Sequence, residues 1–164
     1  MVYTFFGAIM SNAYLSKNFT VAELSKSNTA KANKIDNTPK GVHLNNMQEL
    51  VTKFLQPLRE ELGLPIQVNS GYRSEKLNSI IPGASKTSAH CYGLAVDIVC
   101  PSYGNAKKFT QYVVDFCKRK NIKFDQIIYE FNSWCHFGLK NRSNEQRGKL
   151  LIIDKAGTRA VTKF

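Results

Sequence analysis

Apolar positions along the chain predict helices in its first part. Between residues 44 and 62 they recur at helical spacing, which predicts a long helix that Pro57 should kink. Thr20 starts a capping-box sequence and therefore predicts a short helix before it. A further amphipathic helix should begin at Asn105 as its N-cap and end in the basic turn 118–120, which complements the helix dipole.

Shorter apolar runs predict strands at 66–69, 93–99, 124–131, 134–139 and 150–154. Polar segments at 25–41 and 74–88 predict surface loops, and the second is long enough to suggest a functional loop. Helices followed mainly by strands predict a single α+β domain, with helices on one face of a largely antiparallel sheet. We expect this domain to span residues 19–164, after an N-terminal extension of residues 1–18.

The net charge of the chain limits the classes of partner that we expect. The 164 residues include 23 Lys and Arg against 12 Asp and Glu, a net charge of +11 that attracts polyanions such as nucleic acid or a bacterial cell wall. No predicted helix carries the basic stripe of a nucleic-acid reader, so we expect no nucleic-acid partner. No apolar run reaches the roughly 18 residues of a membrane span, so we expect no membrane insertion.

The cysteines and the N-terminus suggest a protein made in a reducing compartment. The four cysteines form no CxxC pair, and we expect buried thiols at Cys91, Cys100, Cys117 and Cys135. The segment 1–10 is apolar but has neither a basic start nor a small-residue cleavage site. We therefore expect synthesis in the bacterial cytoplasm without a signal peptide.

Two of the three histidines lie in segments with further polar residues. One segment runs Ser88-Ala-His-Cys-Tyr-Gly-Leu-Ala-Val-Asp97, and the other runs Trp134-Cys-His-Phe-Gly138. Two imidazoles and one carboxylate are the donors of a catalytic zinc site, which keeps a fourth position open for water. Strand alternation places Asp97 on the opposite face from Val96 and Ile98, so Asp97 should point into a cleft if those two pack on the helices. His43 fits no ligand pattern.

These segments resemble the zinc D-alanyl-D-alanine carboxypeptidases of peptidase family M15, with their relatives the vancomycin-resistance dipeptidases and phage L-alanyl-D-glutamate endolysins. The shared patterns are SxHxxGxAxD at residues 88–97 and WxHxG at residues 134–138. The similarity extends to the segments Ser70-Gly-Tyr-Arg-Ser74 and Asn37-Thr-Pro39, and covers roughly residues 19–155. It is greatest to the phage and prophage branch.

The resemblance implies one zinc ion per chain, held by His90, Asp97 and His136. It also implies that Arg73 orients the substrate and stabilises charge on the attacked carbonyl. We expect the substrate cleft to be lined by Arg73, Ser88, Tyr92 and Trp134. For the two aromatic residues a place in the core is the alternative.

The general base departs from the family pattern. Many relatives carry an acidic residue three positions before the last histidine, where this chain has Ser133. The nearest carboxylate is Glu130, which would pair with His136 on one face if residues 132–134 form a three-residue turn. A two-residue turn at 132–133 would send Glu130 to the opposite face. We predict the odd-length turn, and Glu130 as the base.

The resemblance implies hydrolysis of amide bonds in peptidoglycan stem peptides, by a carboxypeptidase or an endopeptidase. A monomeric phage or prophage lysin that acts on the cell wall after release fits the expected absence of a signal peptide. Because Ser133 departs from the pattern, a non-catalytic metal-binding and wall-binding module of the same fold remains the alternative. D-Ala-D-Ala, L-Ala-D-Glu and cross-bridge bonds are alternative targets, and these metal donors accept several divalent ions.

Overall fold

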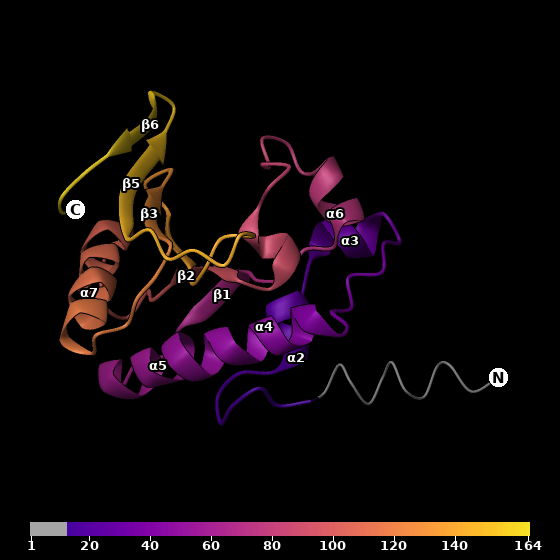
Figure 1. Ribbon diagram of the computed structural model, residues 1–164, viewed down its shortest axis with the longest axis horizontal. Coiled ribbons are helices and arrows are strands. Elements are labelled where there is room, and N and C mark those ends of the chain that lie inside the picture. Colours follow the sequence, from indigo (N-terminus) through magenta and orange to yellow (C-terminus); the bar gives the residue numbers. More distant parts are fainter. Residues whose placement is uncertain (1–12) are drawn as a thin grey trace.

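Six strands form one mixed sheet in the order β1-β2-β4-β3-β5-β6 (Figure 1). The structure is a computed structural model that describes residues 13–164. β3 and β5 run parallel, and the other neighbouring pairs are antiparallel. The strands are β1 Gln67–Ser70, β2 Ala95–Val99, β3 Gln126–Glu130, β4 Trp134–Gly138, β5 Lys149–Asp154 and β6 Gly157–Ala160. The predicted α+β domain with a largely antiparallel sheet is confirmed.

Helices pack against this sheet. They are α2 Val21–Ser25, α3 Asn28–Ala32, α4 Val42–Leu50, η1 Val51–Leu55, α5 Gln56–Leu62, α6 Glu75–Ile80, η2 Ala89–Tyr92 and α7 Ala106–Arg119. Figure 1 shows α4 and α5 end to end along the sheet, while α6 and the β5–β6 hairpin lie on opposite sides of its centre. Within residues 13–164, the helices are too short or too polar to span a bilayer.

The alternation of β2 gives the sheet two different faces. Val96 and Ile98 are buried in the main hydrophobic core beneath the helices. In the same core, the rings of Phe54 from η1 and Phe137 from β4 stack 3.4 Å apart at their centroids. Asp97 therefore projects from the opposite face, as its position in the strand predicts.

A π-helical turn comes just before Pro57, where a kink was predicted. The backbone N–H of Gln56 donates to the carbonyl of Val51, five residues back, as in a π-helix. Pro57 has no N–H to donate, and its ring crowds the preceding turn of a regular α-helix. The wider η1 turn accommodates the ring, and the predicted long helix continues through α5.

The two predicted loops contain helices, so those predictions are wrong in part. Ser27 accepts from the N–H of Ala30 and starts α3, and Ser74 accepts from the N–H of Leu77 and starts α6. These serines are N-caps rather than turn residues. The strand β6 was not predicted either, because its four residues are all exposed and carry no apolar alternation.

The chain before β1 reaches into the core. The predicted extension, residues 1–18, lies largely outside the described residues, as does the segment 1–10 considered for a signal peptide. Within the described part, Leu15 is buried in the main core.

All four cysteines are free and buried, as predicted, and burial raises the pKa of the Cys117 thiol to about 12.

Candidate metal centre

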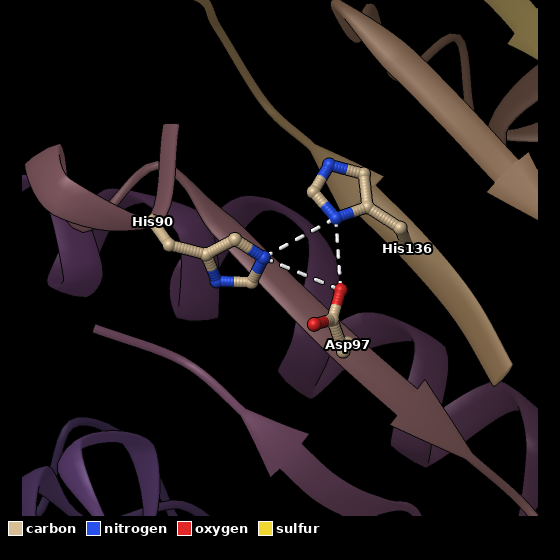
Figure 2. Close-up of side chains that lie close together, drawn as sticks. All are labelled: His90, Asp97 and His136. Atoms are coloured by element: carbon tan, nitrogen blue, oxygen red, sulfur yellow. Dashed lines mark hydrogen bonds and ion pairs between the residues drawn. The ribbon is translucent and has the colours of Figure 1, made fainter. Parts of the chain in front are cut away.

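Three side chains meet on the face of the sheet opposite the main core (Figure 2). His90 comes from η2, Asp97 from β2 and His136 from β4. Asp97 and His136 lie directly opposite each other in the antiparallel register of β2 and β4, so their side chains are neighbours. The structure thus brings together all three residues predicted to bind the metal.

Two of the three separations between their donor atoms match those around a tetrahedral ion, and the third is a hydrogen-bond distance. His136 Nδ1 lies 2.8 Å from Asp97 Oδ1, while His90 Nε2 lies 3.3 Å from Asp97 Oδ1 and 3.3 Å from His136 Nδ1. Ligands about 2.0–2.1 Å from a tetrahedral zinc ion would be roughly 3.3–3.4 Å apart. The three residues are only 2%, 8% and 6% exposed, in the order His90, Asp97, His136. Donor set, spacing and burial therefore suit Zn²⁺.

A backbone carbonyl orients His90. His90 Nδ1 lies 2.7 Å from the carbonyl oxygen of Gly71, so Nδ1 carries the proton and Nε2 presents its lone pair to the ligand cluster. Gly71 runs against α2, where an added Cβ would collide with the carbonyl oxygen of Leu24. Glycine is therefore required at this position for the close approach rather than for an unusual backbone conformation.

Gly71→Ala should reduce the free energy of unfolding by about 1–3 kcal/mol, the usual effect of overpacking. It should also weaken zinc binding, because the carbonyl that holds His90 must move away from Leu24. Thermal unfolding and a zinc titration would measure the two effects. Asn69→Ala, an exposed change on β1 two positions before Gly71, is the control. Native stability and zinc affinity in Gly71→Ala would contradict this account of His90.

Gln126 supports the second imidazole and was missed by sequence reasoning. Its side-chain amide nitrogen lies 3.4 Å from His136 Nε2, the ring nitrogen that faces away from Asp97. An amide can donate to this nitrogen or, turned over, accept from it. With a proton on His136 Nδ1, the amide donates to Nε2. With a metal on Nδ1, the proton is on Nε2 and the amide oxygen accepts from it. The only sequence signal was that Gln126 shares a strand face with Glu130.

Protonation in the metal-free protein follows from burial and charge. Burial lowers the pKa of His90 more than Asp97 raises it, so His90 stays neutral. Burial alone would also lower the pKa of His136, but the hydrogen bond and charge of Asp97 raise it above its ordinary value. The two imidazoles outweigh the burial of Asp97 and hold the pKa of its carboxyl far below the usual range. The metal-free site therefore keeps a proton between His136 and Asp97.

Zinc affinity should therefore depend on pH. Zinc must displace the proton that His136 Nδ1 donates to Asp97, so affinity should fall as pH decreases through the raised pKa of His136 and level off above it. Calorimetric titrations near pH 7, in buffers with different ionisation enthalpies, should show release of up to about one proton per zinc bound. An affinity that does not change between about pH 5.5 and 7.5 would contradict this protonation scheme.

The β3–β4 turn places Glu130 beside the site. The turn consists of residues 131–133, so its predicted odd length is confirmed. The predicted pairing is wrong, because Glu130 lies opposite Trp134, and Ile128 lies opposite His136. The turn begins one residue earlier than predicted, because Phe131 as well as Asn132 takes the left-handed conformation. The shift of two positions preserves the face, and Glu130 stays on the side of His136.

The Glu130 carboxyl lies in the same cleft as the three candidate ligands. Its Oε2 accepts a hydrogen bond of 2.9 Å from the indole Nε1 of Trp134. Burial raises the pKa of Glu130, and the negative charge of Asp97 raises it further, while His136, Trp134 and Arg73 act in the opposite direction. A carboxyl with a raised pKa beside a metal site suits a general base that later acts as an acid.

Hydrogen bonds fix Arg73 but, within residues 13–164, leave part of its guanidinium without a partner. Its Nη2 donates to Ser88 Oγ at 3.1 Å, and its backbone N–H donates to the carbonyl of His90 at 3.1 Å. Its Nε is buried without a partner in the described part of the chain. Ser88 Oγ also accepts from the backbone N–H of His90, so one hydroxyl ties Arg73 to the turn that carries a ligand.

Asn37, noted above only as part of a shared segment, fixes the backbone on both sides of Arg73. Its amide donates to the carbonyl of Tyr72 at 3.0 Å and accepts from the N–H of Ser74 at 2.7 Å. These two bonds connect segments that are more than 30 positions apart in the sequence. Sequence spacing alone gives no indication of this contact.

The predicted site residues share one cleft, with a single exception. The cleft has a volume of about 610 Å³, and its lining includes Arg73, Ser88, His90, Asp97, Glu130, Trp134 and His136. Tyr92 is not part of this lining. Its ring packs edge-on against His43, 6.1 Å between centroids, because η2 turns it toward α4. The structure therefore does not bring Tyr92 to the cleft, whereas Trp134 lines it.

This buried donor set on the open face of an α+β sheet is typical of a metallopeptidase. Residues 17–138 match the family described as Peptidase M15, and this match covers more than half of the chain. The chain therefore belongs to the Peptidase M15 family. The matched region contains the three candidate ligand residues together with Arg73 and Glu130. No curated protein matches the chain.

Proposed function

We propose that this protein is a zinc-dependent peptidase that hydrolyses amide bonds in the stem peptides of peptidoglycan. The observation that carries the proposal is the close approach of the donor atoms of His90, Asp97 and His136 in a cleft shared with Glu130 and Arg73. Membership of the Peptidase M15 family supports the reaction class. The net charge of +11 supports an anionic cell wall as the target.

Bound zinc would polarise the scissile carbonyl and lower the pKa of a water molecule. Glu130 takes a proton from the attacking water and delivers it to the leaving amine. Trp134 keeps the Glu130 carboxyl in place through its indole N–H. Arg73, steadied by Ser88, directs its free donors to the oxygen that gains negative charge.

We further propose that the protein acts as a phage or prophage lysin, reaching the wall after release from the cytoplasm. A spread of positive charge would retain such an enzyme on the wall, and this attraction weakens with salt. Cleavage of a terminal D-Ala-D-Ala bond and of an internal L-Ala-D-Glu bond are both compatible with an open cleft of this size.

The test is to incubate the zinc-loaded protein with purified peptidoglycan sacculi of several wall types and to identify released fragments by mass spectrometry. New peptide termini that disappear with a chelator and return with zinc are the expected result, and their identity names the bond. Stoichiometric zinc without new termini on any wall type would overturn the peptidase and favour a non-catalytic wall-binding module.

A further inference from the structure

One part of the cleft lining takes no role in the proposed chemistry. Ile128 on β3 lies beside Leu151 on β5, and Glu130 lies beside Ile153, so the two β5 side chains share the face of the site. Ile128 is buried, and Leu151 and Ile153 are half-buried. All three line the cleft, which gives it an apolar floor next to Glu130.

Phe131 stands at the rim of this floor in an unfavourable conformation. Its φ is +47°, a left-handed value that is rare for a bulky residue, and its side chain is 49% exposed. Turns of this kind favour glycine or asparagine. A hydrogen bond of 2.8 Å from its N–H to the carbonyl of Ile153 holds the backbone in place. The left-handed backbone costs stability, and about half of the ring stays exposed to solvent.

The ring of Phe131 extends the apolar floor toward Trp134. The two ring centroids lie 5.6 Å apart, and both residues line the cleft. Glu130 lies between these groups. Phe131 follows it in the chain, and its two cross-strand neighbours are Trp134 on β4 and Ile153 on β5. A substrate amide within reach of the Glu130 carboxyl therefore brings its neighbouring side chain against this apolar surface.

We propose that Phe131, Trp134, Leu151 and Ile153 form an apolar subsite for the aliphatic side chain of the substrate residue next to the scissile amide. Phe131 is then a specificity-determining residue, and its strained backbone is retained because binding uses the ring. This proposal rests on the proposed peptidase function and names the part of the substrate that the cleft selects. An acidic side chain would be poorly bound there, because the surface offers it no polar partner.

The test compares Phe131→Asn with the wild type on two synthetic stem peptides, one with alanine and one with glycine beside the scissile bond. Asparagine tolerates the left-handed backbone, so the melting temperature should stay equal or rise, with unchanged zinc affinity. The kcat/KM for the alanine peptide should fall about 10-fold, mainly through KM. The glycine peptide should react equally slowly with both proteins. Tyr14→Asn removes an exposed aromatic residue outside the cleft and is the control.

Equal kcat/KM for the wild type and Phe131→Asn on the alanine peptide would overturn the subsite. If Phe131→Asn fails to fold, Phe131→Leu decides: an aliphatic replacement should keep the preference for alanine over glycine, and loss of that preference contradicts the proposal. If the wild type cleaves no peptide, the proposed function fails instead. The subsite is then tested by calorimetric binding of the alanine peptide to the zinc-loaded wild type and Phe131→Asn, where equal affinity overturns it.

Discussion

Replacing Glu130 with glutamine should lower the rate of peptide hydrolysis by a factor of about 10² to 10⁴, the usual contribution of a positioned general base. The amide keeps the shape of the side chain and can still accept the hydrogen bond from Trp134. It has no carboxylate to take a proton from water. Because Glu130 is not among the three ligand residues, zinc content should not change.

The stability of Glu130→Gln separates a catalytic role from a structural one. Burial raises the pKa of Glu130 above its ordinary value of 4.5, so the folded protein binds this proton more tightly than the unfolded chain. Above the raised pKa, the ionised Glu130 therefore lowers the free energy of unfolding. Near neutral pH the melting temperature of Glu130→Gln should equal or exceed that of the wild type. Glu60→Gln, an exposed change on α5, is the control, and wild-type turnover in Glu130→Gln would remove Glu130 from the mechanism.

Asp97→Asn should weaken zinc binding by more than about 100-fold, since losing even an outer partner of a ligand typically costs 10–100-fold. Both imidazoles face Asp97 Oδ1. Because imidazole is neutral or positive, this carboxylate is the only negative charge among the three candidate ligand residues. The neutral amide is a poorer ligand and can present its NH₂ group to the ion. Competition titrations against a chelator of known affinity would measure the loss.

Hydrolysis by Asp97→Asn should disappear at low zinc and recover only in part when zinc is in excess. Asp115→Asn, on α7 in the helical layer, is the matched control and should bind zinc as the wild type does. Wild-type zinc affinity in Asp97→Asn would show that the ion binds elsewhere. Wild-type affinity combined with a lower melting temperature would assign Asp97 a purely structural role.

The sequence predicted those elements whose burial pattern is strong. The helix from Asn105 follows from its one buried face, and the two faces of β2 follow from the alternation of Val96 and Ile98 with Asp97. The helices α3 and α6 have only five and six residues, too few for a helical period to be recognised. Their serine caps are equally common in turns. The strand β6 is exposed on both faces and is held by pairing with β5, which leaves no pattern in its own residues.

Some residues of the candidate site could be predicted from the sequence, and others could not. Residue type and spacing were enough to select His90, Asp97 and His136, because few side chains bind metals and their segments match a family signature. Gln126 and Phe131 depend on which strands become neighbours and on the residue at which a turn begins. Tyr92, for which a place in the core was the alternative, is close to His90 in sequence, but η2 turns its ring toward His43.

X-ray absorption at the zinc edge of the wild-type protein identifies the ligands of the bound ion. A centre formed by these three residues should hold one zinc per chain with four nitrogen or oxygen ligands at about 2.0–2.1 Å, including the outer-shell scattering of two imidazoles. A sulfur shell at about 2.3 Å would place the ion on a cysteine instead. That result, or a zinc signal without imidazole, would contradict a metal centre formed by His90, Asp97 and His136.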